Sequence, residues 1–307
     1  MIRYILKRIA WLILVLFAVT FIVFAVTYHL PGANLEFLSN GEPANGLAKV
    51  LAAVGLYDTF VGDFFLFILK YVIKLDFTFL LSNNPSNISA LPSRIKYTLI
   101  LCLSSVVLSW IVGMPLGIAA ATHKGKKLDT GITSLTVALG SMPTFWTGLM
   151  LLLVFAGLLR IVSTLFKGPS SLILPIIALT LSNIPIVTGA TRSGLVETFD
   201  KDYILTVRAK GLSEKAIIWA HAVRNSMLPL LSILSSQLTK ALGGALVLEM
   251  VFSIPGLGML MFNSISTRDF PLLMLCILMA ATFSGLISVI ADAIYAAVNP
   301  AVRQRFE

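Results

Sequence analysis

The chain has 307 residues, of which 57% are hydrophobic and 12% charged, and its formal net charge is +9. Soluble domains contain about one quarter charged residues. This composition therefore excludes an ordinary soluble enzyme, a disordered chain and a disulfide-stapled secreted module. The two cysteines, Cys102 and Cys276, lie in apolar runs without metal-ligand spacing, so we interpret both as small hydrophobic residues.

Six apolar stretches are long enough to cross a bilayer, whose hydrocarbon core of about 30 Å needs about 20 helical residues. Lipid offers the backbone no hydrogen-bond partner, so spanning segments of this kind are helical. We expect an all-α integral membrane protein with six transmembrane helices. The stretches are Ile9–Tyr28, Tyr97–Thr122, Thr130–Leu159, Gly168–Thr191, Met227–Phe252 and Phe270–Ala291.

The first stretch follows Arg3, Lys7 and Arg8, as the apolar core of a signal peptide would. It is too long for a cleaved segment and lacks a small-residue cleavage site, so we expect a retained helix. The apolar run Phe64–Ile73 is too short to span, and we expect an interfacial helix there. The chain then divides into residues 1–96, with the first helix and an extracytoplasmic segment, and residues 97–307, a five-helix core.

The basic residues gather on one side of this six-helix topology, in the termini and in the connections 123–129 and 192–226. Because Lys and Arg favour cytoplasmic loops, both termini are predicted to be cytoplasmic. The net charge is thus mainly a topology signal. It does not indicate a nucleic-acid surface, because the positive charges are scattered over short loops.

The chain contains no phosphate-binding loop, metal-ligand cluster or nucleophile motif. Glu249 and Asp292 are acids within the apolar stretches, and Lys240 is the one strong midspan cation. We expect neither catalysis nor a cofactor or metal site in this chain. Proline and glycine interrupt the second to fifth stretches, which fits close packing of membrane helices or a bundle that rearranges around a pathway.

The connection 197–229 is too long and too patterned for a simple turn. Asp200 or Asp202 can cap a helix that runs to Lys210, Gly211 ends it, and Ser213 can cap a second helix. The second helix has an apolar stripe at Ala216, Ala220, Val223 and Met227. Such an amphipathic pair could rest on anionic headgroups or dock a cytoplasmic partner.

Two motifs in this connection resemble a known family. Arg208-Ala-Lys-Gly-Leu212 and His221-Ala-Val-Arg-Asn225, followed by Pro229, are similar to the coupling loop of ABC importer permeases in the dipeptide, oligopeptide and nickel branch, specifically their B-type membrane subunit. The general E-A-A signature of importers is degenerate here, and residues 34–93 match the family least. Further resemblances lie at Arg3–Pro31, Pro115–Ile118, Lys124–Asp129, Glu249–Gly258, Arg268–Pro271, Asp292–Tyr295 and Asn299–Arg303.

The resemblance implies the fold of type I ABC importer permeases, in a multi-pass protein of the bacterial inner membrane. It also implies a second, related permease subunit in a heterodimer, two cytoplasmic ATPase subunits that bind ATP and Mg²⁺, and an extracytoplasmic substrate-binding protein. The residues implied to form the ATPase-coupling loop are Arg208, Ala209, Lys210, Gly211, Leu212, Ser213, Glu214, His221, Arg224 and Asn225.

The run Ile254–Gly258 ends the fifth apolar stretch, because it contains Pro255, Gly256 and Gly258. The apolar residues Met259–Ile265 that follow are too few to cross, so we expect a short helix that re-enters the outer leaflet near the outer mouth of the pathway. A plain turn is the alternative.

By resemblance the substrate is a di- or oligopeptide, and nickel, a metallophore or glutathione are alternatives. A transporter driven by an ion gradient is a rival from another class, and it predicts polar or charged groups at mid-membrane, where Lys240 is the candidate. An assembly factor without transport activity is a third possibility, and it would use the loop only for docking.

Overall fold

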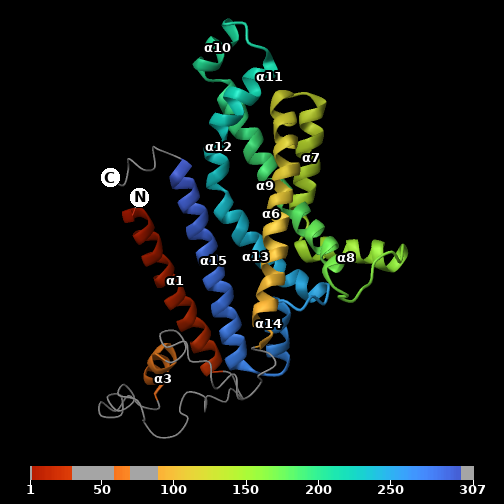
Figure 1. The fold of residues 1–307 in the computed structure, drawn as a ribbon. Helices are drawn as coiled ribbons and strands as arrows, with labels where there is room; N and C mark the ends of the chain where they lie inside the picture. Colours follow the sequence, from red (N-terminus) through yellow and green to blue (C-terminus); the bar gives the residue numbers. More distant parts are fainter. Residues whose placement is uncertain (1, 30–58, 70–88, 299–307) are drawn as a thin grey trace.

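The computed structural model describes residues 2–29, 59–69 and 89–298. Every regular element in these ranges is helical (Figure 1), in agreement with the expected all-α class. In chain order they are α1 (Ile2–Tyr28), α3 (Phe60–Phe67), α6 (Leu91–Thr122), α7 (Lys127–Ser141), α8 (Thr144–Leu152), η3 (Leu153–Leu158), η4 (Pro169–Leu172), α9 (Ile173–Phe199), α10 (Asp202–Ala209), α11 (Glu214–Ala216), η5 (Ile217–Ala222), α12 (Val223–Ser232), α13 (Leu234–Val251), α14 (Leu257–Ser266) and α15 (Phe270–Val298). The motif Asn299–Arg303 and most of residues 34–93 lie outside the described ranges.

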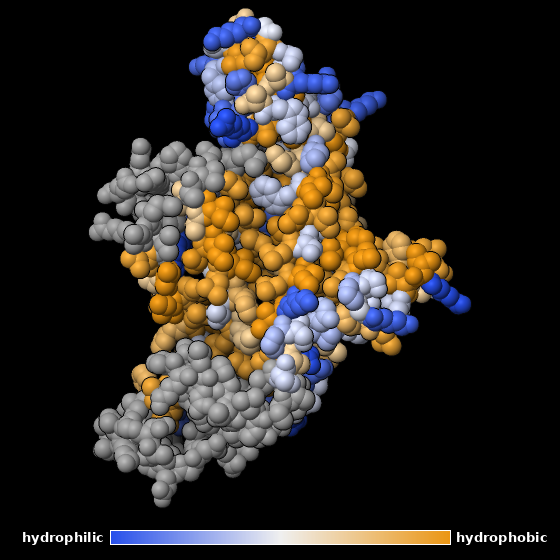
Figure 2. All heavy atoms as spheres, in the orientation of Figure 1, coloured by the Kyte–Doolittle hydropathy of each residue, from blue (hydrophilic) through white to orange (hydrophobic). Residues whose placement is uncertain are grey.

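Four helices of the described part are long and apolar enough to cross a membrane, and two bent helix pairs bring the number to as many as six. The single helices are α1, α6, α9 with η4, and α15. Hydrophobic side chains form a broad band across the bundle, and hydrophilic ones gather at the tip that carries α10 and α11 (Figure 2). α1 begins and α15 ends toward that same tip (Figure 1).

The third expected span, Thr130–Leu159, is not one straight helix. α7 ends at Ser141, α8 begins at Thr144, and the two helices differ in direction by 94°. Met142 between them is extended, with ψ 126°, and Pro143 follows it. A residue before proline is disfavoured in the α region, and proline has no amide hydrogen with which to continue a helix. α8 therefore projects sideways from the bundle (Figure 1).

The fifth expected span, Met227–Phe252, is also bent rather than straight. The helical stretch Glu214–Ser232 continues from the 197–229 connection into the bundle, and it meets α13 with a bend of 52°. The second helix of the connection and the first part of this span are thus one continuous element, whereas the sequence analysis treated the connection 197–229 and the span Met227–Phe252 as separate segments.

α6 and α9 form the most extensive helix pair of the core. Gly113 and Gly117 of α6 lie against Val187 and Thr191 of α9, and a Cβ atom on either glycine would come within 3.0 Å of these side chains. Thr188 donates its hydroxyl to the Gly113 carbonyl at 3.1 Å. The two glycines therefore serve close packing between membrane helices, one of the two interpretations that the sequence left open.

α1 packs on α15 and on α3, and only 11% of its most apolar window is buried. Phe24 of α1 is fully buried among Phe60, Phe64 and Phe67 of α3, with ring centroids 5.5 to 5.6 Å apart. The expected helix in the Phe64–Ile73 run is therefore present as α3, which begins four residues earlier. Residues 70–73 lie outside the described ranges.

Candidate functional site

The 197–229 connection forms two helices joined by a tight turn at one end of the bundle (Figure 1). α10 ends at Ala209, and Gly211 then adopts a left-handed φ of +80°. Ser213 caps the second helix, because its hydroxyl accepts a hydrogen bond from the Ala216 amide at 3.4 Å. Glycine adopts positive φ without the clash of a Cβ atom. The predicted helix–glycine–helix shape and the Ser213 cap are confirmed.

An ion pair closes the turn around Gly211. Arg208 Nε donates to Glu214 Oε1 at 2.7 Å, and its Nη2 donates to Oε2 at 3.2 Å. These hydrogen bonds raise the pKa of Arg208 and lower the pKa of Glu214 below its usual range. Both side chains are exposed, so the pair adds little stability, but its two-pronged geometry fixes the end of α10 relative to the start of α11.

The inner side of this connection is anchored on the ends of two long helices. Ile204 of α10 and Ile217 of η5 are fully buried in a cluster that includes Ile118 of α6 and Leu195 of α9. Hydrophobic burial of this kind holds both arms of the turn on the bundle. The tip is therefore positioned by the same helix pair, α6 and α9, that forms the core.

A polar contact joins the two arms directly. Asn225 Nδ2 of α12 donates to the hydroxyl of Tyr203 in α10 at 2.8 Å. Asn225 is among the residues implied by the family resemblance, whereas sequence reasoning gave no role to Tyr203. A hydroxyl and an amide 22 residues apart carry no spacing signal, so only the fold could reveal the pair.

The capping prediction for α10 is wrong. The residue at the N-cap is Lys201, which makes no side-chain capping bond, and Asp202 lies in the first turn of the helix. Asp200 instead follows the end of α9 and pairs with Lys124 at 3.5 Å. Asp202 still places a negative charge near the positive end of the α10 dipole.

The apolar stripe predicted for the second helix is also wrong in part, since Ala220 is exposed. The fully buried residues are Ile217 and Ala222, which are five positions apart. They delimit η5, a π-helical segment whose hydrogen bonds join residues five apart. The 3.6-residue period used for the prediction therefore fails over this stretch.

The outer surface of the connection is mixed apolar and basic. Leu205 and Trp219 are 57% and 62% exposed, and Leu212 beside the glycine turn is 38% exposed. The residues that the resemblance implies for coupling are all exposed except the half-buried His221; they are Arg208, Ala209, Lys210, Gly211, Leu212, Ser213, Glu214, Arg224 and Asn225. This surface suits docking of another protein, because exposed aromatic and aliphatic side chains can be buried on contact.

A second ion pair braces the same end of the bundle. Arg192 near the end of α9 donates from Nε and Nη2 to the two carboxylate oxygens of Asp129 in α7, at 2.5 and 2.7 Å. Asp129 also accepts the amide of Gly125 at 2.9 Å. Sequence analysis assigned no role to either member of the pair, and their separation of 63 residues gives no signal.

The predicted outer-mouth element lies at the other end of the bundle, where α13 turns into α14 (Figure 1). Glu249 is fully buried. Its carboxylate accepts one hydrogen bond from the Thr98 hydroxyl at 2.5 Å and another from the Gly258 amide at 2.6 Å. The carboxylate thus caps the N-terminus of α14. A Cβ atom on Gly256 would collide with this carboxylate, and one on Gly258 would collide with the backbone of Leu246.

The short helix expected after Pro255 is present as α14, so a plain turn is excluded. Its ten residues are too few to cross a membrane. Leu257 at its start also donates its amide to the Thr98 hydroxyl at 3.1 Å. The glycines and proline of this corner therefore allow a tight turn that is tied to α6.

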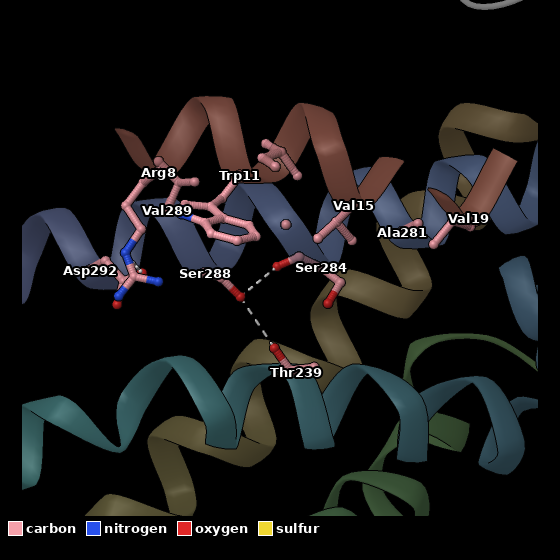
Figure 3. A pocket seen from close by; sticks show the side chains of 12 residues that line it. Arg8, Trp11, Val15, Val19, Thr239, Ala281, Ser284, Ser288, Val289 and Asp292 are labelled. Carbon is pink, nitrogen blue, oxygen red and sulfur yellow. Dashed lines mark hydrogen bonds and ion pairs between the residues drawn. The ribbon is translucent and has the colours of Figure 1, made fainter. Parts of the chain in front are cut away.

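A cavity of about 410 Å³ opens between α1, α13 and α15 (Figure 3). It is mostly apolar, and Thr239 and Ser288 meet across it with their hydroxyl oxygens 3.3 Å apart. Arg8 of α1 and Asp292 of α15 form an ion pair of 3.1 Å at one end of the cavity. This ion pair joins α1 to α15 beside the cavity.

The acids that the sequence singled out within the apolar stretches pair with groups of their own chain. Asp292 pairs with Arg8, and Glu249 accepts hydrogen bonds from Thr98 and from α14. Within residues 2–29, 59–69 and 89–298, no group of three or more His, Cys, Asp or Glu side chains is arranged to hold a metal ion. The two acids act here as links between helices.

The fold is similar to that of a solved transporter. A chain of the MetNI methionine ABC transporter, in an inward-facing conformation, superimposes with a TM-score of 0.61 and 17% sequence identity. The match covers 69% of this chain and 97% of that chain. At this identity the likeness concerns the fold alone.

Whole-length relatives are more similar in sequence. The glutathione transport system permease protein GsiC of Salmonella choleraesuis is 34% identical over 310 residues, which cover 99% of this chain and 100% of the relative. The protein of the same name from Escherichia coli K12 is 32% identical over 309 residues. Residues 113–304 match the family model for the binding-protein-dependent transport system inner membrane component. The chain therefore belongs to this family and is a permease subunit of the type I ABC importers, in the peptide and nickel branch.

Proposed function

We propose that this permease couples to cytoplasmic ATPase subunits through the 197–229 connection. The observation that carries the proposal is the turn around Gly211, which is exposed at the tip yet fixed by the Arg208–Glu214 pair and by the buried Ile204 and Ile217. A stiff, anchored projection can transmit the movement of a partner to the helices behind it. A mobile loop in the same place could not.

The tip that carries α10 and α11 is the cytoplasmic end in this proposal. The basic connections 123–129 and 192–226 lie there, and α1 begins and α15 ends toward it. The positive-inside rule gives the same orientation. Both termini are then cytoplasmic, and the α13–α14 corner with Pro255, Gly256 and Gly258 lies near the extracytoplasmic mouth.

The complete importer contains a second, related permease, two ATPase subunits and an extracytoplasmic binding protein. This chain binds neither ATP nor Mg²⁺ in the proposal, because the ATPase subunits hold both, and it takes no catalytic part. ATP-driven closure of the ATPases displaces the two coupling connections, and the helices attached to them reorient. Lipid covers the remaining apolar surface.

We propose a short peptide as the substrate, with glutathione as the first candidate. Two relatives that match over their full length are named as glutathione transport permeases. Glutathione is itself a modified tripeptide, so it belongs to the peptide class that the motifs imply. Nickel or a metallophore would need a different binding protein, and no contact in the described residues favours either.

The proposal is tested by reconstituting the whole complex in proteoliposomes and measuring ATP-dependent uptake of radiolabelled glutathione. Uptake should require ATP and the binding protein. The variant Gly211→Arg should abolish uptake while the complex hydrolyses ATP without transport, or should fail to bind the ATPases. Uptake by this chain alone under an ion gradient would establish the secondary-transporter alternative instead.

A further inference from the structure

Lys240 of α13 is a charged side chain in the middle of the bundle, and neither the coupling connection nor the outer corner uses it. It is exposed, and its Nζ donates to the backbone carbonyl of Ser182 in α9 at 3.2 Å. Pro185 follows in the same stretch of α9 and has no amide hydrogen to complete the helical ladder. Lys240 thus lies beside an interrupted part of a spanning helix.

The depth of this contact follows from the length of α9. Ser182 is ten residues from Arg192, which corresponds to about 15 Å of helix. It is thirteen residues from Pro169, where the helical element begins, or about 20 Å. Half of a hydrocarbon core is about 15 Å. The Lys240 ammonium is therefore near the middle of the membrane, too deep for a lipid headgroup to meet it.

No carboxylate lies within ion-pair distance of Lys240 in the described part of the chain. A lysine that faced hydrocarbon at this depth would be very costly, so such residues face water or another polar group. Exposed small residues lie along the same two helices. Gly243 and Ser236 on α13 are exposed, as are Gly189 and Ser193 on α9, and a Cβ atom on either glycine would meet open space.

Irregular backbone lies at the same level. Gly140, at the end of α7, approaches Pro185, since a Cβ atom there would be 3.3 Å from the proline ring. The exposed residues Met142 and Pro143 then form the break before α8. Non-helical backbone at membrane depth is tolerated where it is buried in protein or borders a water-filled cavity. Met142 and Pro143 are not buried within this chain, so the chain itself does not cover the break.

We propose that Lys240 lies in the aqueous translocation pathway and binds a carboxylate of the passing substrate. This inference rests on the proposed function, because a peptide or glutathione carries the carboxylate that an ammonium recognises. The hydrogen bond to Ser182 holds the side chain in place while leaving two further N–H donors for a ligand. The group is a specificity-determining contact for anionic cargo within the membrane.

The first test uses the complete transporter in proteoliposomes. Lys240→Gln should lower the rate of ATP-dependent glutathione uptake about tenfold, because a loss of this size is expected when one charge-assisted hydrogen bond to the substrate is removed. Lys240→Arg should retain most of the rate, because it keeps the charge. Lys167→Gln, which removes an exposed lysine from the loop before α9, is the control and should behave as the wild type. Full uptake by Lys240→Gln would overturn the proposal.

The second test does not depend on activity. Lys240→Cys, with Cys102 and Cys276 replaced by alanine, should react with a membrane-impermeant anionic methanethiosulfonate. An unreactive cysteine would place the residue against lipid or against the second permease, and this result would overturn the proposal. If the wild-type complex takes up no glutathione, the proposed substrate fails, whereas labelling still decides where Lys240 lies.

Discussion

Arg192 and Asp129 join the end of α9 to the start of α7 through two parallel hydrogen bonds, and the Asp129 side chain is only 5% exposed. A second ion pair, between Lys124 and Asp200, links the same region across a surface where both side chains are more than half exposed. Both pairs join a carboxylate to a basic side chain, but they differ in burial. They therefore allow a matched comparison of how much a buried and an exposed ion pair contribute to the free energy of unfolding.

Asp129→Asn should lower the free energy of unfolding by about 2 kcal/mol, because it leaves the partly buried Arg192 guanidinium without its counter-charge. Asp200→Asn should change it by less than about 0.5 kcal/mol, as is usual for exposed pairs. Thermal unfolding in detergent measures both. Equal shifts in Tm for the two variants would contradict the assigned bracing role of Asp129.

Gly211→Ala should destabilise the turn between α10 and α11 by about 1 kcal/mol, because alanine is strained at a φ of +80°. The expected consequence is poorer coupling, seen as fewer glutathione molecules taken up per ATP hydrolysed by the reconstituted complex. Gly131→Ala is the matched control, since that glycine lies inside α7 with no atom near its Cβ position. A normal ratio in Gly211→Ala would show that the shape of this turn does not govern coupling.

Thr98→Val should destabilise the α13–α14 corner by about 1 to 3 kcal/mol. The substitution removes the hydroxyl that donates to the buried Glu249 carboxylate and accepts the Leu257 amide. Thr98→Ser keeps that hydroxyl and should stay close to the wild type. Hydrogen exchange of the first amides of α14, measured by mass spectrometry, should accelerate only in the valine variant.

Asp292→Asn should loosen α1 from α15 with little effect on the rest of the bundle. The ion pair with Arg8 is half exposed on the arginine side, so its loss should cost about 0.5 kcal/mol globally. Leu12 of α1 lies directly against Gly285 of α15, so Leu12→Cys with Gly285→Cys reports the helix contact by disulfide formation. The crosslinking rate should fall in Asp292→Asn, and an unchanged rate would mean that packing alone positions α1.

Local chemistry made part of this structure predictable. The thickness of the bilayer identifies the six apolar stretches as candidate spans. The rules of helix termination predict the turn at Gly211 and the cap at Ser213. Each of these signals lies within a few residues of the feature that it predicts. The 94° break before α8 also has a local signal, because Pro143 lies in it. Hydropathy alone misses the break, since the apolar stretch continues across it.

The remaining features depend on residues far apart in the chain. Glu249 meets Thr98 across 151 residues, and nothing in either neighbourhood predicts the other. The buried face of the second helix in the 197–229 connection was misjudged because η5 changes the helical period between Ile217 and Ala222. Ile217 packs in a cluster with Ile118 of α6 and Leu195 of α9, which lie far from it in the sequence.

The shallow attachment of α1 has a consequence for how the chain is organised. The family match begins at residue 113, inside α6, so α1 lies outside the unit that defines the family. α1 packs mainly on α15, whereas the most extensive helix pair of the core is α6 with α9. α1 and the helix pair at the centre of the core are therefore different parts of the fold. A helix attached in this way can change its packing partner while the α6–α9 core stays undisturbed.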